Sequence, residues 1–313
     1  MLQRVTAIVG PTASGKSSLA DRVAVALRSA VISVDAMQIY RGMDTGTAKT
    51  PAHERTAPLL MVDVADIGSE YSVQLFQREA RARIDDLLAR GLHPVLCGGT
   101  GLYLDAVIDE MAFPTGVKGS ATRTAYEDIA RTQGAEALHA VLAARDERAA
   151  ALIHPNNVRR VVRALEMADE GVSYADQNAT LKVRAPHYDT TLWAITMNRE
   201  RLYARIDLRV DQMFEAGLVD EVRALAERGL NAQSTAGQAI GYKEVLQALA
   251  GEISMDEARD LVKRRTRHYA KRQLSWLRRD GRARWLDSDT IDEDEAVRLV
   301  LEATNDSPQQ KGL

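Results

Sequence analysis

The sequence of 313 residues is poor in cysteine, in aromatic residues and in long apolar runs. Its one cysteine, Cys97, excludes an internal disulfide and fits a reducing compartment. One cysteine and six scattered histidines leave no ligand set spaced for zinc. No apolar run approaches the ~20 residues of a transmembrane helix, and the N-terminus lacks the pattern of a signal peptide. We therefore expect a cytoplasmic protein without a membrane span.

Charge of one sign is also scarce overall, because the net charge is only −3. That average conceals a basic stretch from 263 to 284, in which ten lysines and arginines accompany a single acid, Asp280. An acidic run that begins at Asp287 offsets it. A cationic helix is often just solvated surface, but such a concentration in an acidic chain favours contact with nucleic-acid phosphates.

Short apolar runs alternate with amphipathic helical patterns over the first hundred residues. Residues 5–9, 31–34 and 94–97 have the composition of buried strands, and a helix is predicted from about Ser72 to a stop at Gly91. A further strand is predicted at 191–196, and mostly helix from there to about 279. This alternation predicts the α/β class, with a parallel sheet flanked by helices.

The domain organisation follows from where this rhythm breaks. Residues 113–189 are rich in Ala, Arg and Glu and hold almost no β-branched runs, so we expect an all-helical insertion that opens at 114–116. The catalytic core is then formed by residues 1–112 and 190–287. Residues 288–313 are predicted to be an acidic, partly disordered tail, with disorder from about Asn305.

A phosphate-binding loop is the strongest motif. Residues 10–17 read Gly-Pro-Thr-Ala-Ser-Gly-Lys-Ser and match G-x-x-x-x-G-K-[ST] between a predicted strand and a predicted helix. Its backbone N–H groups and helix N-terminus attract an anion, Lys16 adds a full positive charge, and the Ser17 hydroxyl is placed to ligate Mg²⁺. The motif predicts a P-loop but does not distinguish ATP, GTP or a diphosphate ester.

Two other predicted strands end in polar or small residues, at the sheet edge where ligands collect. Asp35 follows the second strand, and it is either a proton acceptor beside the P-loop or a helix N-cap. Gly98–Gly101 follows a later strand and includes Thr100. The small residues permit close approach of the backbone, although a tight strand–helix turn alone would also explain them.

These segments together resemble the tRNA dimethylallyltransferases, also called tRNA isopentenyltransferases. The resemblance covers about residues 7–279 and rests on blocks that occur in the order of that family. The blocks are the P-loop at 10–17, Asp-Ala-Met-Gln-Ile-Tyr at 35–40 continuing to Lys49, Gly-Gly-Thr-Gly-Leu-Tyr at 98–103, His-Pro-Asn-Asn at 154–157 continuing to Glu166, Ala-Ile-Gly-Tyr-Lys-Glu at 239–244 and Tyr-Ala-Lys-Arg-Gln-Leu-Ser-Trp-Leu-Arg at 269–278.

The resemblance implies a P-loop NTPase-like fold and transfer of a dimethylallyl group from its diphosphate to N6 of the adenosine 3′ to the tRNA anticodon. It implies a monomer that binds the tRNA anticodon stem-loop, dimethylallyl diphosphate and Mg²⁺. The implied catalytic residues are Asp35, Thr100, Lys16 and Arg209. The implied diphosphate-binding residues are Gly10, Pro11, Thr12, Ala13, Ser14, Gly15, Lys16, Ser17 and Arg205, with Ser17 and Thr12 as metal ligands. The implied tRNA contacts are Asp35, Ala36, Met37, Gln38, Thr100, Arg123, Arg159, Arg160, Arg163, Gly241, Lys271 and Arg272.

Three other functions are compatible with a P-loop. A small-molecule kinase would not need the basic helix and should carry an arginine-bearing lid. A non-enzymatic P-loop module would leave Asp35 and Thr100 unexplained. An adenylate isopentenyltransferase would need neither the helical insertion nor the basic stretch.

Overall fold

The computed structural model describes residues 1–69, 71–113, 120–181 and 183–305. Its chain divides into two compact units. One consists of Met1–Ile108 and Pro186–Leu313, and the other of Asp109–Ala185. The segment 114–116, at which the helical insertion was predicted to open, lies outside the described residues.

The first unit is built on a six-stranded sheet in which every adjacent pair of strands is parallel. In spatial order the strands are β3 (Leu59–Leu60), β2 (Val31–Ser33), β4 (Val95–Gly98), β1 (Arg4–Val9), β5 (Asp189–Thr196) and β6 (Arg284–Asp287). The predicted α/β fold with a parallel sheet is confirmed. All the carboxyl ends meet at one edge, so the loops after β1, β2 and β4 converge there.

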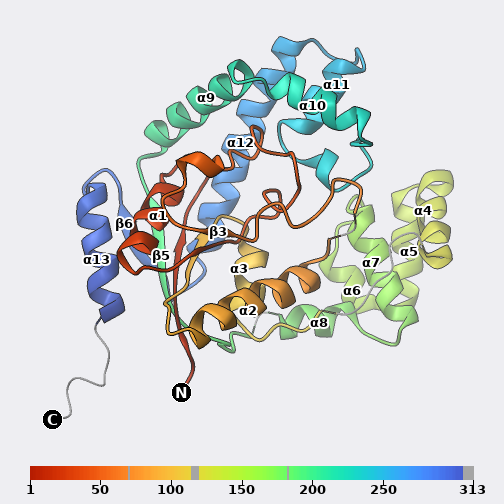
Figure 1. Ribbon diagram of the computed structural model, residues 1–313. Helices are drawn as coiled ribbons and strands as arrows, with labels where there is room; N and C mark the ends of the chain where they lie inside the picture. The colour runs from red at the N-terminus through yellow and green to blue at the C-terminus, as the bar shows by residue number, and fades with distance from the viewer. Residues whose placement is uncertain (70, 114–119, 182, 306–313) are drawn as a thin grey trace. The chain divides into compact units, whose positions relative to one another are not determined.

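Helices cover both faces of this sheet (Figure 1). On one face pack α1 (Lys16–Ala26) and α13 (Glu293–Asn305). On the other pack α2 (Val73–Ala89) and α3 (Gly101–Ile108). Helix α2 begins where predicted, with the Ser72 side chain accepting from a backbone N–H of its first turn, and its apolar residues at i, i+4 and i+8 are buried.

Helix α13 departs from the predicted acidic, partly disordered tail. Ala296 and Val300, four residues apart, are buried, and Glu293 and Asp294 bond to Ser18 at 2.6 Å and Arg22 at 2.5 Å on α1. Residues 293–305 therefore belong to the folded core of the first unit. The helix was not predicted because its apolar residues form only a narrow stripe in an acidic segment. The part of the predicted disordered end from 306 to 313 lies outside the described residues.

Four helices lie between β5 and β6, as predicted for 198–279, with the 3₁₀ turn η2 (Ala236–Gln238) between the second and third. They are α9 (Arg199–Glu215), α10 (Leu218–Glu227), α11 (Tyr242–Leu249) and α12 (Met255–Leu277). A capping box between Ser254 and Glu257 fixes the start of α12. Another short 3₁₀ turn, η1 (Ala52–Glu54), lies in the long loop between β2 and β3.

The second unit contains only helices among its described residues, as the fold prediction required. They are α4 (Ala121–Gln133), α5 (Ala135–Arg145), α6 (Glu147–Leu152), α7 (Val158–Asp169) and α8 (Tyr174–Thr180). A separate core that includes Leu138, Leu142 and Leu165 holds them together. Across the described residues of both units, no helix combines the length and apolarity that a membrane span requires.

Candidate active site

A cavity of about 500 Å³ opens in the first unit where the strand ends converge. Thr12, Lys16 and Ser17 line it after β1, Ser33 and Asp35 at the end of β2, and Thr100 after β4. Helices α9, which supplies Arg209, and α12 line it from the other side. Its walls combine these polar groups with apolar side chains, among them Ile206, Val210, Met213 and Val262.

The P-loop has the strained backbone that an anion-binding turn needs. Ala13 has φ of 63° and Gly15 has φ of 93°, and the loop passes directly from β1 into α1. Of its eight residues, Thr12, Lys16 and Ser17 line the cavity, whereas Gly10, Pro11, Ala13, Ser14 and Gly15 form the supporting turn. The loop therefore lies at the cavity with the N-terminus of α1 directly after it, and its binding of phosphate stays a prediction.

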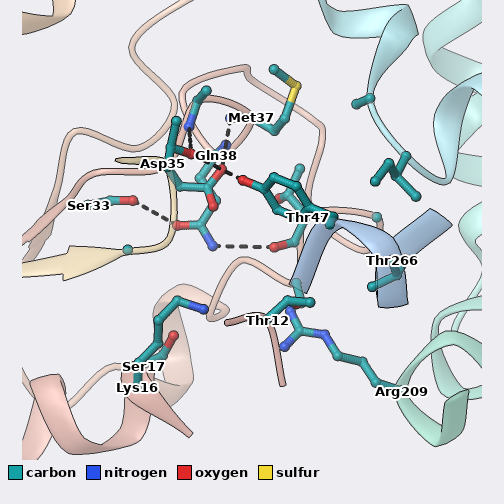
Figure 2. A pocket seen from close by; sticks show the side chains of 18 of the residues that line it. Thr12, Lys16, Ser17, Ser33, Asp35, Met37, Gln38, Thr47, Arg209 and Thr266 are labelled. Atoms are coloured by element: carbon teal, nitrogen blue, oxygen red, sulfur yellow. Dashed lines mark hydrogen bonds between the residues drawn. The ribbon is translucent and has the colours of Figure 1, made fainter. Parts of the chain in front are cut away.

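Lys16 and Arg209 bring positive charge into the same cavity from opposite segments (Figure 2). The Lys16 ammonium donates to the Pro11 carbonyl oxygen at 3.2 Å. Burial lowers the pKa of Lys16 and of Arg209; Arg209 lowers the pKa of Lys16 further, while Asp35 opposes both shifts. Two buried cations in one cavity are unfavourable unless anions accompany them, and Asp35 supplies only one negative charge there, so the cavity favours a bound polyanion.

Asp35 caps the turn at 36–39 and not a helix, and its predicted role as proton acceptor stays a prediction. Its Oδ1 atom accepts from the backbone N–H of Met37 at 2.9 Å and of Gln38 at 3.4 Å, as in an N-cap. No protein donor to Oδ2 is found among the described residues. Ala36, Met37 and Gln38 also line the cavity, so one oxygen shapes this turn while the other remains available for a ligand.

Thr100 is held directly beside this turn. Its Oγ1 accepts from the backbone N–H of Ala36 at 3.2 Å and lies 3.5 Å from the Tyr269 hydroxyl. Burial raises the pKa of Tyr269 to about 12, so that hydroxyl stays protonated at neutral pH. The structure thus brings together Asp35 and Thr100, which are predicted catalytic residues from different strand ends.

Gln38 has a fixed amide orientation in the cavity (Figure 2). Ser33 Oγ donates to its Oε1 at 2.9 Å, and its Nε2 donates to the Thr47 carbonyl oxygen at 3.3 Å. An amide held in this way presents one donor and one acceptor in a set arrangement, which suits the edge of a nucleobase.

The two arginines predicted to clamp a diphosphate lie in different places. Arg209 lines the cavity, but Arg205 does not. The Arg205 Nε instead donates to the Ala13 carbonyl oxygen at 2.8 Å, behind the P-loop. Arg205 therefore supports the loop backbone and does not line the cavity. It differs from Arg209 in this respect although the two lie only one helical turn apart on α9.

Gln273 is a site residue that the sequence reasoning missed. This buried side chain accepts from the Thr12 backbone N–H at 3.0 Å and donates to the Gly99 carbonyl oxygen at 2.9 Å. It ties the P-loop to the loop after β4. The one signal for it was an uncharged polar residue on the apolar side of an otherwise cationic helix.

Gly98–Gly101 form the short turn between β4 and α3, and their small size is also required by close packing against other segments of the protein. A Cβ atom at Gly98 would lie 2.5 Å from the Val34 carbonyl oxygen, and one at Gly101 would overlap the Trp276 ring. The small residues therefore let two strand ends and α12 meet around the cavity.

Two predicted tRNA contacts of the first unit lie outside the cavity lining. Gly241 has φ of 97° and donates its N–H to Glu244 at 2.7 Å, so its observed role is to start α11. Lys271 is exposed on α12. Arg272 is exposed too, but it lines the cavity and lies over the Tyr269 ring at 5.5 Å.

The cations of the basic helix α12 and of the residues directly after it form two groups, one paired with neighbouring helices and one exposed. Lys263 and Arg267 pair with Asp211 at 2.7 Å and Asp207 at 3.0 Å on α9, and Arg265 pairs with the buried Glu244 on α11. These three cations hold helices together. Five others are exposed and form no ion pair among the described residues: Arg264, Lys271 and Arg272 on α12, and Arg278 and Arg279 directly after it. Arg259 is half-buried and lies over the Phe214 ring at 5.0 Å.

The second unit shows the same division among its predicted tRNA contacts. Arg159 and Arg160 are exposed at the start of α7. Arg123 pairs with Glu127 at 3.0 Å and with the buried Glu166 at 3.2 Å, and Arg163 lies 3.7 Å from Glu166. Arg123 and Arg163 therefore help to stabilise this unit.

The residues around the P-loop fit a Mg²⁺ ion. The hydroxyls of Ser17 and Thr12 and the carboxylate of Asp35 all face one cavity, and hydroxyl and carboxylate oxygens are the ligands that Mg²⁺ prefers. Among the described residues no group of three His, Cys, Asp or Glu side chains could form a metal cage. A Mg²⁺ ion here would therefore take most of its ligands from water and phosphate oxygens, as it usually does.

Comparison with known proteins shows the family of the chain. The family model described as IPP transferase matches residues 38–280, and a model described as isopentenyl transferase matches residues 3–57. The chain is 46% identical to the tRNA dimethylallyltransferase of Streptomyces coelicolor, over 95% of both chains.

Solved structures give the same result. The tRNA isopentenylpyrophosphate transferase of Staphylococcus epidermidis matches with a TM-score of 0.72 and 36% identity, over 97% of this chain and 99% of that one. A eukaryotic dimethylallyltransferase acting on tRNA matches with a TM-score of 0.80 and 27% identity, over 98% of this chain and 80% of that one. The chain belongs to the tRNA dimethylallyltransferase family of prenyltransferase enzymes.

Proposed function

We propose that the chain transfers the dimethylallyl group of dimethylallyl diphosphate to N6 of the adenosine 3′ to the anticodon of tRNA, releasing diphosphate. The observation that carries this proposal is the pairing of two groups of residues in one cavity. Lys16, Ser17 and Arg209 suit the diphosphate, whereas Asp35 and Gln38 suit the adenine (Figure 2).

The diphosphate end of the cavity stabilises a leaving group. As the C–O bond of the donor breaks, the diphosphate takes the electron pair and gains negative charge. Lys16, Arg209 and the P-loop N–H groups are fixed where that charge develops, and each such donor contributes about 3 kcal/mol to lowering the barrier. A Mg²⁺ ion held by Ser17 and Thr12 would supply further positive charge to the phosphate oxygens.

The adenine end of the cavity activates a weak nucleophile. The exocyclic amine has its lone pair delocalised into the ring, so removal of its proton as the N–C bond forms assists the reaction. The Oδ2 atom of Asp35 is available to accept that proton. General base catalysis of this kind raises the rate by about 10²–10⁴-fold. Thr100 holds the turn beside it, and Gln38 contacts the base edge.

The adenosine must leave its stack to reach this cavity, which we propose happens by extrusion of the nucleotide. The exposed cations of α12 and of α7 in the helical unit would bind the phosphates of the anticodon stem-loop. We further propose that the enzyme works as a monomer in the cytoplasm; the single cysteine, which cannot form an internal disulfide, fits a reducing compartment.

A direct assay tests the proposal. The protein is incubated with dimethylallyl diphosphate, Mg²⁺ and either unmodified tRNA or AMP, and the nucleosides are analysed by mass spectrometry. We expect isopentenylated adenosine from tRNA and none from a tRNA that carries guanosine at that position. Product from AMP alone would contradict the proposal and favour an adenylate isopentenyltransferase, and phosphate transfer from ATP would favour a kinase.

A further inference from the structure

The loop that carries Asp35 and Gln38 is held from outside the cavity by a carboxylate on α10. Three successive backbone N–H groups donate to Glu221: Asp44 at 3.2 Å and Thr45 at 2.7 Å to Oε2, and Gly46 at 3.3 Å to Oε1. A carboxylate that accepts charge-assisted bonds from consecutive amides fixes the conformation of that backbone segment. Glu221 itself does not line the cavity.

Tyr242, at the start of α11, completes this contact. Its side chain is fully buried, and its hydroxyl donates to Glu221 Oε1 at 2.5 Å. Burial, reinforced by the charge of Glu221, raises the pKa of Tyr242 strongly, so the hydroxyl is a permanent donor. A Cβ atom at Gly46 would overlap the Tyr242 ring, so the loop and the ring are in direct contact.

The held segment acts on Gln38 through a single residue. Thr47 follows Gly46 directly, and its carbonyl oxygen accepts from Gln38 Nε2 at 3.3 Å. The Thr47 hydroxyl also donates back to the Met43 carbonyl oxygen at 2.5 Å, so the turn is closed on itself. The position of the Thr47 carbonyl, and with it the direction of the Gln38 amide, therefore depends on where residues 44–46 are held.

We propose that Glu221 is a positioning residue for recognition of the adenosine, acting through residues 44–47 on Gln38, and that Tyr242 assists it. The inference rests on the proposed function, because Gln38 is the group that contacts the base there. Donor binding should be independent of Glu221, since Lys16, Ser17 and Arg209 come from other segments.

Glu221→Gln is the sharpest test because it keeps the shape of the side chain. An amide accepts through only one of its two terminal atoms, so it satisfies either the partners of Oε1 or those of Oε2 but not both. The matched control is Asp220→Asn on the same helical turn, whose carboxylate is exposed and pairs with Arg223. We expect kcat/KM for tRNA to fall about tenfold in Glu221→Gln and to stay unchanged in Asp220→Asn.

A double-mutant cycle separates positioning from general structural damage. If Glu221 acts through Gln38, then Glu221→Gln should add almost nothing to the loss caused by Gln38→Ala alone. The dissociation constant for dimethylallyl diphosphate should match the wild type in every variant. If Glu221→Gln does not fold, Tyr242→Phe, which removes one donor only, is carried through the same cycle with an expected loss of about threefold.

Three outcomes would overturn the inference. They are an unchanged kcat/KM for tRNA in the folded position-221 variant, losses that multiply fully in the double mutant, and an equal weakening of donor binding. The wild-type reaction in the same assay reports on the proposed function separately. No prenylated tRNA with the wild-type protein would refute that function and this inference together, whereas normal wild-type turnover with any of the three outcomes would refute only the inference.

Discussion

Lys16 and Arg209 lie in the cavity, whereas Arg264 and Lys271 on α12, and Arg278 directly after it, are exposed. Both regions collect positive charge, but burial lowers the pKa of the first two, while water and salt screen the other three. Buried charge of this kind acts on the reacting bond, and exposed charge acts on long-range attraction of a polyanion. Lysine and arginine therefore affect the rate of the chemical step when they are buried, and the salt dependence of tRNA binding when they are exposed.

The largest expected effect comes from removing the carboxylate in the cavity. Asp35→Asn keeps an acceptor for the turn at 37–38 but removes the proton acceptor, so kcat should fall by about 10²–10⁴-fold. Single-turnover kinetics at saturating tRNA would measure this change.

Binding of tRNA to this variant, measured by filter binding, should equal that of the wild type at every salt concentration. Loss of tRNA binding together with turnover would show that Asp35 has a structural role only.

The exposed cations on α12 and directly after it should give the opposite result. Replacing Arg264, Lys271, Arg278 and Arg279 by Gln should weaken tRNA binding and lower the slope of log K against log salt by about 3, because each lost phosphate contact contributes about 0.7–0.9. The measurement is a salt titration of the tRNA dissociation constant.

A matched control removes one paired cation of the same helix. Lys263→Gln with Asp211→Asn removes one cation together with its partner and should leave the slope unchanged. If the variant with the exposed cations replaced keeps the wild-type slope, these cations do not contact tRNA phosphates.

Arg265, the paired cation that faces α11, should affect stability more than binding. Arg265→Ala leaves the carboxylate of Glu244, which is buried, without its cation, and we expect a loss of about 1–3 kcal/mol in the free energy of unfolding. Urea titration followed by circular dichroism measures this loss. An unchanged midpoint accompanied by weaker tRNA binding would place Arg265 with the exposed cations.

The smallest effect is expected in the helical unit, where the same contrast recurs. Arg159→Gln with Arg160→Gln removes two exposed cations and should lower the salt slope by about 1.5, with no change in stability. Arg123→Gln should instead destabilise the unit, since Glu166 is buried beside it. The salt titration and the urea titration measure these two effects. A loss of stability in the Arg159 and Arg160 variant, or a lower salt slope in Arg123→Gln, would contradict this division between exposed and paired cations.

Local patterns were enough to predict much of the molecule. Helix α2, the P-loop and the turn at Asp35 each depend on residues close together in the sequence, such as Ser72 with the apolar spacing that follows it. Their convergence in one cavity followed from the parallel sheet, since the strand ends share an edge.

Contacts between distant segments could not be predicted in this way. Gln273 bonds to Thr12 across 261 positions, and Glu221 bonds to Thr45 across 176. Which cations of α12 are paired depends on Asp207 and Asp211, which face Arg267 and Lys263 only once α9 and α12 pack. A charge count along one helix does not contain that information.

In the proposed reaction, the P-loop holds the departing diphosphate beside the adenine-binding groups. A crystal structure with the unreactive thio-analogue of dimethylallyl diphosphate tests it most directly. We expect phosphate oxygens within hydrogen-bond distance of Lys16 Nζ, with the prenyl carbon directed toward Asp35. A diphosphate bound elsewhere, with the P-loop vacant, would contradict it.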